Sequence, residues 1–209
     1  MSKSKNLYIL GYSGHAYVVI DVATSCDYII RGYFDFEQSL KNPYDLTYLG
    51  DENKQDLYSI VGGHFVFPAV GSNAIREKLY WLLKNNGYEQ ISLIDKSAYV
   101  SLKTTLEEST LIAPKAVVNS GTVIGKACII NTGAIIEHEC KIGDFAHIAP
   151  GAVLAGNVNI GSNTFLGANC VVKQGTMIGK NAIVGAGAVV VKDIPEGETW
   201  AGNPAIKLK

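Results

Sequence analysis

The chain has 209 residues, with 18 lysines and arginines against 19 aspartates and glutamates, so its formal charge at pH 7 is −1. This balance leaves no basic footprint for nucleic acid or an anionic membrane, and a hydrophobic content of 47% supports a packed core rather than a disordered chain. No apolar run reaches the roughly 18 residues of a membrane span. The N-terminus carries no cleavable signal pattern, so we expect a cytoplasmic protein.

The first ninety residues alternate short apolar runs with helical patterns. The pattern predicts, in chain order, a strand at 7–10, a helix at 16–24, strands at 29–34 and 65–70, and a helix at 74–86. Alternating strands and helices are typical of an open parallel sheet. We therefore expect a Rossmann-like α/β domain over residues 1–90, within which residues 37–63 give no clear pattern.

The carboxyl ends of these strands are where an open parallel sheet binds ligands. The first strand runs into the glycine-rich turn Gly11–His15, which is suited to a phosphate but lacks the complete dinucleotide fingerprint. Asp35 ends the second strand, where a carboxylate can bind a ribose or sugar hydroxyl, and Gly71 follows the third. These positions predict a nucleotide or nucleotide-sugar pocket. The alternatives are an unliganded tight turn and an exposed strand-end carboxylate.

A period of six residues governs the second half of the chain. From Ile94 to Val190 every sixth residue is Ile, Leu or Val, at seventeen successive positions. The residue two places earlier is never larger than valine, and the residue three places later is Gly or Asn at nine of sixteen positions. This combination predicts a parallel β-solenoid of about eighteen residues per coil, with three strands and three turns. We place it at residues 91–194, followed by a C-terminal tail at 195–209.

Three of the four cysteines fall in the small, inward phase of this repeat. Cys128, Cys140 and Cys170 occupy three different walls of the predicted prism, so they cannot stack on one another. We expect buried structural thiols and no disulfide among them.

Two histidines interrupt the repeat in the segment IEHECKIGDFAHIAPG. Glu139, beside His138, stands in the phase that elsewhere favours Gly or Asn, and such a departure indicates a functional position. The alternative is two surface histidines on an exposed wall. His147 follows half a coil later, on a different side of the prism. Since one subunit cannot bring His138 and His147 together, a composite site requires a cyclic homo-oligomer.

The repeat and the ordered segments GYSGHA, YFD, VGSNAIR, IEHECKIGDFAHIAPG and GNPA resemble a known family over almost the entire chain. The chain resembles the NeuD/PglD-like sugar acyltransferases, which are trimers with a left-handed β-helix. The resemblance implies transfer of acetyl from acetyl-CoA to the 4-amino group of a nucleotide-linked 4-amino-4,6-dideoxy sugar in glycan biosynthesis. UDP-, dTDP- and GDP-linked sugars remain open, and O-acetylation of a sugar hydroxyl, as for sialic acid, is the alternative.

The same resemblance assigns roles to individual residues. His138 matches the general base, Glu139 the acid that raises its basicity, and His147 a contact to acetyl-CoA from the adjacent subunit. Backbone groups at Ala168 and Ala186 match the contacts to the pantetheine arm. The nucleotide-sugar pocket matches Ser13, Gly14, His15, Asp35 and Gly71. Phe36 stands where the bacillosamine enzyme has a second acid, and it either stacks on a base or packs.

These residue types suit direct acyl transfer. An imidazole beside a carboxylate can remove the proton of an attacking amine, and a backbone N–H near Gly156 can stabilise the oxyanion. No cysteine or serine lies in a nucleophile setting, so we expect no acyl-enzyme. A zinc hydratase on the same scaffold needs about three histidine ligands, and the repeat has two, so we predict no metal. A non-catalytic sensor or scaffold is the remaining alternative.

Overall fold

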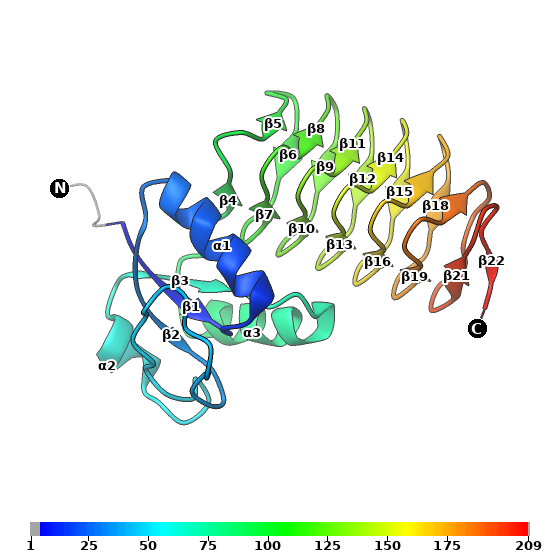
Figure 1. The fold of residues 1–209 in the computed structure, drawn as a ribbon. Helices are drawn as coiled ribbons and strands as arrows, with labels where there is room; N and C mark the ends of the chain where they lie inside the picture. Colours follow the sequence, from blue (N-terminus) through cyan, green and yellow to red (C-terminus); the bar gives the residue numbers. More distant parts are fainter. Residues whose placement is uncertain (1–4, 209) are drawn as a thin grey trace.

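The computed structural model describes residues 5–208 and contains an α/β domain packed against the side of a long β-solenoid. Figure 1 shows the coils advancing from β4 and β5, beside the α/β domain, to β21 and β22 at the opposite end. This arrangement confirms the predicted fold class. No helix within residues 5–208 is long and apolar enough to cross a membrane.

The α/β domain is built on a parallel sheet with strand order β2-β1-β3. Its elements are β1 (Asn6–Leu10), α1 (Gly14–Ser25), β2 (Ile29–Phe34), α2 (Leu57–Val61), β3 (Phe65–Pro68) and α3 (Asn73–Asn85). All five predicted elements are present. Helix α1 begins two residues before the predicted start, and β3 ends at Pro68 instead of residue 70, where the chain turns toward Gly71.

Residues 37–63 contribute α2 and a single β-bridge between Tyr33 and Tyr48. The side chain of Asp56 caps α2 by accepting hydrogen bonds from the N–H groups of Tyr58 and Ser59. A helix of five residues is too short to show a hydrophobic period, which explains why no element was predicted here.

The solenoid contains seventeen two-residue strands, and the second residue of each is one of the aliphatic residues of the six-residue period. Each strand pairs in parallel with the strand one coil away, as Ile130 does with Ile112 and Ile148. The strands are β4 (Leu93–Ile94), β5 (Tyr99–Val100), β6 (Thr105–Leu106), β7 (Leu111–Ile112), β8 (Val117–Val118), β9 (Val123–Ile124), β10 (Ile129–Ile130), β11 (Ile135–Ile136), β12 (Lys141–Ile142), β13 (His147–Ile148), β14 (Val153–Leu154), β15 (Asn159–Ile160), β16 (Phe165–Leu166), β17 (Val171–Val172), β18 (Met177–Ile178), β19 (Ile183–Val184) and β20 (Val189–Val190).

These strands form three sheets, which we call walls. Wall 1 contains β4, β7, β10, β13, β16 and β19, wall 2 contains β5, β8, β11, β14, β17 and β20, and wall 3 contains β6, β9, β12, β15 and β18. Within the segment predicted as a tail, β21 (Thr199–Ala201) extends wall 1, and β22 (Ile206–Lys207) pairs with it antiparallel. Trp200 pairs there with Val184, in the place of a further aliphatic residue.

The turns between walls adopt left-handed backbone conformations at the predicted phase. Every such position from Ser109 to Gly187 has a positive φ, including Glu139 at 61°. Lys115 has a φ of 59°, so a charged residue at this phase is not peculiar to the predicted site. The departure at Glu139 was therefore a weaker functional signal than expected, because the coil geometry imposes this φ on whichever residue stands there.

The interior of the solenoid is a continuous column of aliphatic and small side chains. Cys128, Cys140 and Cys170 are buried in it as free thiols that precede strands of walls 1, 3 and 2. Burial raises the pKa of Cys128 and of Cys170 to about 12. The prediction of separate, buried thiols is confirmed.

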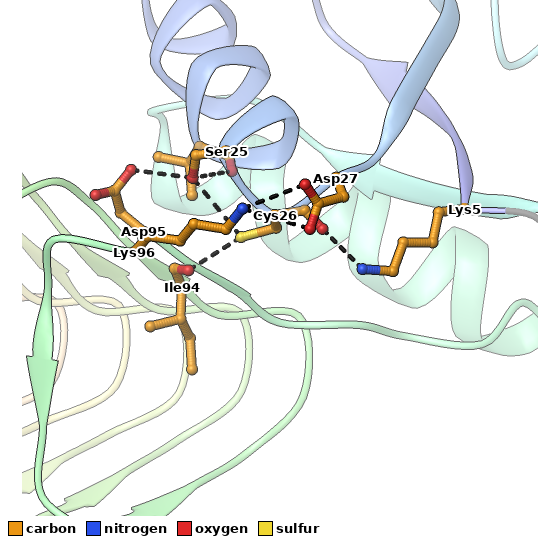
Figure 2. Close-up of polar contacts among 8 residues, drawn as sticks. Lys5, Ser25, Cys26, Asp27, Ile94, Asp95 and Lys96 are labelled. Carbon is orange, nitrogen blue, oxygen red and sulfur yellow. Dashed lines mark hydrogen bonds and ion pairs between the residues drawn. The ribbon is translucent and has the colours of Figure 1, made fainter.

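The α/β domain covers part of wall 1. The outward residues Leu93, Leu111 and Ile129 are buried in the same apolar cluster as the core of that domain. At the end of α1, Cys26 donates from its thiol to the carbonyl of Ile94 at 3.0 Å (Figure 2). Lys96 lies 3.2 Å from the carboxylate of Asp27 in the same region. The first coil of the solenoid is therefore joined directly to the α/β domain.

Candidate functional site

His138 and Glu139 occupy the turn where the chain passes from wall 2 to wall 3. The Nδ1 atom of His138 lies 3.0 Å from Oε2 of Glu139, and the two side chains are 54% and 70% exposed. With Nδ1–H donating to the carboxylate, the lone pair of Nε2 is left free. An exposed imidazole with this tautomer can accept a proton from a ligand.

Gly156 lies one coil beyond His138, directly against the imidazole. A Cβ added to Gly156 would lie 2.6 Å from Nε2 of His138, closer than a side chain tolerates. Among residues 5–208 no acceptor is found for the N–H of Gly156. The absence of a side chain at Gly156 thus leaves room for the His138 imidazole, and the N–H of Gly156 is a hydrogen-bond donor beside it.

A second candidate region is a cleft of about 670 Å³ at the start of α1, lined by Tyr12, Ser13, Gly14, Tyr17, Glu37, Gln38, Ser39, Leu40 and Lys41. Ser13 is the N-cap residue of α1, and its side chain makes no capping hydrogen bond. A Cβ at Gly14 would meet no atom within 4 Å, so packing within the chain does not require glycine there. This turn presents the N-terminal end of a twelve-residue helix to the cleft.

Asp35 holds this turn in place. One carboxylate oxygen accepts from the N–H of Tyr12 at 2.8 Å, and the other accepts from the N–H of Phe36 at 2.8 Å. The side chain therefore joins the end of β2 to the glycine-rich turn, a structural contact that the sequence did not predict. Phe36 is 69% exposed beside it and packs in no core cluster of the described residues.

His147 lies on the outer face of wall 1 and faces the α/β domain of its own chain. Its Nδ1 atom is 3.3 Å from the carbonyl oxygen of Gly71, its Nε2 atom is 3.2 Å from Nδ2 of Asn131, and its ring centroid is 6.2 Å from that of His15. The fold thus brings His147 together with His15 and Gly71, two residues of the predicted pocket. His138 lies apart from them, at the turn between walls 2 and 3.

Burial keeps both of these histidines neutral. It lowers the pKa of His147 to about 3, with further contributions from the positive charge of Arg76 and from His15. It lowers the pKa of His15 to about 4, again with the charge of Arg76 adding to the effect. Neither ring can serve as a proton acceptor near neutral pH in this environment.

Ala168 and Ala186 occupy the turn from wall 1 to wall 2 in successive coils. The N–H of Gly187 donates to the carbonyl of Ala168 at 2.8 Å. Within the described part of the chain, the N–H groups of Ala168 and Ala186 have no acceptor. A row of backbone donors therefore lies on the edge of wall 2 opposite to the edge that carries His138.

Arg76, which is 1% exposed, lies beside the site but was not among the residues predicted from the sequence. A signal was present: Arg76, Leu79, Tyr80 and Leu83 form the buried stripe of α3 at helical spacing, so a charged residue occupied a core position. Asn131 was not predicted either, since its contact with His147 joins two neighbouring coils of the solenoid. Among residues 5–208 no group of three His, Cys, Asp or Glu side chains is placed to hold a metal ion.

Comparisons with known families match both parts of the chain. Residues 6–83 match the PglD N-terminal domain, residues 121–156 match the bacterial transferase hexapeptide repeat, and residues 157–192 match the hexapeptide repeat of succinyl-transferase.

Several solved structures resemble this fold along the full chain. PerB from Caulobacter crescentus, in complex with CoA and GDP-perosamine, is 33% identical, with a TM-score of 0.92 over 98% of this chain and 97% of its own. The acetyltransferase domain of PglB from Neisseria gonorrhoeae, in complex with acetyl coenzyme A, is 31% identical, with a TM-score of 0.90 over 99% and 100%. WeeI from Acinetobacter baumannii is 27% identical, with a TM-score of 0.87 over 97% and 99%.

Proposed function

The chain belongs to the NeuD/PglD-like family of hexapeptide-repeat sugar acyltransferases, and we propose that it acetylates the 4-amino group of a nucleotide-linked 4-amino-4,6-dideoxy sugar. Acetyl-CoA is the donor and His138 the general base. The observation that carries the proposal is the 3.0 Å contact between His138 and Glu139, beside the free N–H of Gly156. The relative that binds GDP-perosamine and CoA supports the same substrate class.

The chemistry is a direct attack on the thioester. The neutral amine nitrogen forms a bond to the acetyl carbonyl carbon, and its proton passes to Nε2 of His138. Glu139 stabilises the imidazolium through Nδ1–H. The carbonyl oxygen becomes an oxyanion that accepts from the N–H of Gly156. Collapse of this intermediate breaks the carbon–sulfur bond, and the CoA thiolate leaves and takes up the proton from Nε2 of His138, which returns the base to its neutral form.

The acceptor binds in the cleft at the start of α1. Its diphosphate lies on the backbone of Ser13, Gly14 and His15, where the N–H groups and the helix dipole favour an anion. Asp35 supports the turn and has lone pairs left for a sugar or ribose hydroxyl, and Phe36 offers an exposed ring to the base. Gly71, at which a Cβ would lie 3.7 Å from the His15 side chain, lines a second cavity of about 450 Å³ between α3 and wall 1.

The active assembly is a homotrimer that shares each site between two protomers. Wall 2 carries one apolar column along its whole length, formed by the first residues of its strands, Tyr99, Val117, Ile135, Val153, Val171 and Val189. Such a column favours burial against other copies of the chain. With wall 2 toward a threefold axis, the edge with His138 meets the edge of the next protomer that carries Ala168 and Ala186. The pantetheine arm then lies along that seam.

A panel of acceptors tests the reaction. Thiol release from acetyl-CoA is measured with UDP-, dTDP- and GDP-linked 4-amino-4,6-dideoxy sugars, and with hydroxyl-bearing sugars including sialic acid. We expect turnover with at least one 4-amino sugar and loss of that turnover in His138→Ala. Turnover only with hydroxyl acceptors supports the O-acetyltransferase alternative, and unchanged turnover in His138→Ala excludes the proposed base.

Mixed oligomers test the shared site. His138→Ala and a pocket variant, Gly14→Val, are each expected to be inactive as pure preparations. Co-expression of the two variants restores part of the activity if the Gly14 pocket and His138 of one site belong to different protomers. Some interfaces in a mixed trimer then combine an intact Gly14 pocket with an intact His138. Absence of any recovery, with mixed trimers verified by mass spectrometry, contradicts a site built from two chains.

A further inference from the structure

Arg76 is a buried cation, and no carboxylate among residues 5–208 forms an ion pair with it. Its guanidinium donates five hydrogen bonds: from Nε to the carbonyl of Ala127 at 2.7 Å, from Nη1 to the carbonyls of Val70 and Gly71 at 3.2 Å each, and from Nη2 to Oδ1 of Asn73 at 2.9 Å and the carbonyl of Phe145 at 2.7 Å. All five N–H groups of the side chain are thereby used. Burial lowers the pKa of Arg76 to about 10, which still leaves it charged near neutral pH.

The five acceptors come from two parts of the molecule. Val70 and Gly71 lie in the connection between β3 and α3, and Asn73 is the first residue of α3, whereas Ala127 and Phe145 belong to turns of the solenoid. We call residues 70–73 the β3–α3 turn. A planar group with five fixed donors can connect these two segments at once, and a lysine ammonium with three donors cannot. Arg76 therefore sets the position of the turn relative to the solenoid.

Further contacts converge on the same turn. The carbonyl of Gly71 accepts from Arg76 and also lies 3.3 Å from Nδ1 of His147. Nδ2 of Asn73 donates to the carbonyl of Asn163 at 2.9 Å, while its Oδ1 atom accepts from Arg76. Gly71 and Asn73 line the cavity of about 450 Å³ between α3 and wall 1. The Gly71 carbonyl and the Asn73 side chain, which belong to residues lining this cavity, are thus held in place by Arg76, His147 and the carbonyl of Asn163.

We propose that Arg76 is a positioning residue, which aligns the turn Gly71–Asn73 with the solenoid so that the acceptor sugar extends from the α/β domain toward the acetyl donor. The inference rests on the proposed function, since it assigns the acceptor to this cavity. His147 holds the same turn, because its Nδ1–H donates to the carbonyl of Gly71, as Arg76 does. Its Nε2 accepts from Asn131, so both ring nitrogens form hydrogen bonds within the chain. Its effect on acceptor binding then comes through Gly71.

The test separates acceptor binding from donor binding. In Arg76→Lys and Asn73→Ala, we expect the KM for the 4-amino sugar to rise about tenfold or more, while the KM for acetyl-CoA changes less than twofold. In Arg76→Ala, millimolar guanidinium is expected to restore part of the lost acceptor affinity, because the ion fits the vacated donor site. His147→Gln is likewise expected to raise the KM for the 4-amino sugar and not the KM for acetyl-CoA. A selective rise in the KM for acetyl-CoA contradicts the role of His147 in positioning Gly71.

The contacts of Figure 2 provide the matched control. Ser25→Ala and Lys96→Ala remove hydrogen bonds or an ion pair between the same two domains, at the first coil and away from the turn. We expect these variants to leave both KM values unchanged. If they raise the acceptor KM as much as Asn73→Ala does, Arg76 is merely structural and the proposal fails. Wild-type protein that acetylates no 4-amino sugar refutes the proposed function instead, whatever the variants show.

Discussion

The solenoid and the α/β domain encode their structures in different ways. In the solenoid, the position of a residue modulo six specifies whether it faces inward, faces outward or forms a turn, and all seventeen predicted strand positions are found in strands. In the α/β domain, Asp35 and Arg76 owe their environments to contacts with residues distant in the chain, Tyr12 and Ala127. In a repeat, the surroundings of each residue follow from its position in the repeat and from the adjacent coils. In a domain without repeats, they depend on how distant elements pack together.

Core substitutions in the solenoid give the largest expected effect. Ile148→Ala and Leu166→Ala, both fully buried, are each expected to lower the free energy of unfolding by about 2–5 kcal/mol. Equivalent phases should give similar losses, within about 1 kcal/mol. Denaturant titration checks this, with Ile183→Ala, 46% exposed on the outer face, as a control of small effect. Widely different losses in the free energy of unfolding at Ile148 and Leu166 would contradict the statement that equivalent positions of the repeat have equivalent surroundings.

Loss of the imidazole at position 138 is expected to affect chemistry rather than folding. His138→Ala should lower kcat about 10²-fold or more, because a general base contributes at that level. Its side chain is 54% exposed, so the melting temperature should stay within a degree or two of wild type. Steady-state thiol release and a thermal melt measure the two quantities. Glu139→Gln should give a smaller loss in kcat.

Gly156→Ala, one coil away, tests whether the position of the His138 ring matters for catalysis. The added methyl group occupies the position of the His138 ring, so the ring must swing away. We expect kcat to fall about tenfold with little change in either KM, as for misplacement of a catalytic group. Gly63→Ala, where a Cβ meets no neighbour and φ is not positive, as at Gly156, is the control for the added methyl group. Equal losses in both variants argue against a contact with His138.

The buried histidines predict a pH dependence of stability at the boundary between the two regions. The pKa values of His15 and His147 are about 4 and 3 in the folded chain, below the usual 6.5. As pH falls below 6.5 the unfolded chain takes up protons that the folded chain does not. The free energy of unfolding should therefore decrease, by up to about 1.4 kcal/mol per pH unit for each ring. Denaturant titrations between pH 6.5 and 5 measure the slope, and His147→Phe should reduce it.

The smallest expected effect on stability is at Gly14. A methyl group there meets no atom of the chain, so Gly14→Ala should leave the melting temperature unchanged or slightly raised. If the turn holds the acceptor diphosphate, the KM for the nucleotide sugar should rise a few-fold, since a backbone approached by phosphate has no room for a side chain. An unchanged KM would show that the acceptor diphosphate does not bind at this turn.

The sequence by itself determined the solenoid, the order of the α/β elements and the His138–Glu139 pair. Periodicity and short-range neighbours specify these features, because side-chain direction along a strand repeats every two residues and the coil repeats every three strands. Only the tertiary structure decided that Asp35 secures the glycine-rich turn, that His147 faces its own α/β domain, and that Arg76 joins the two. Each of these contacts spans more than twenty residues of chain, and no local pattern encodes which distant carbonyl or amide a side chain will meet.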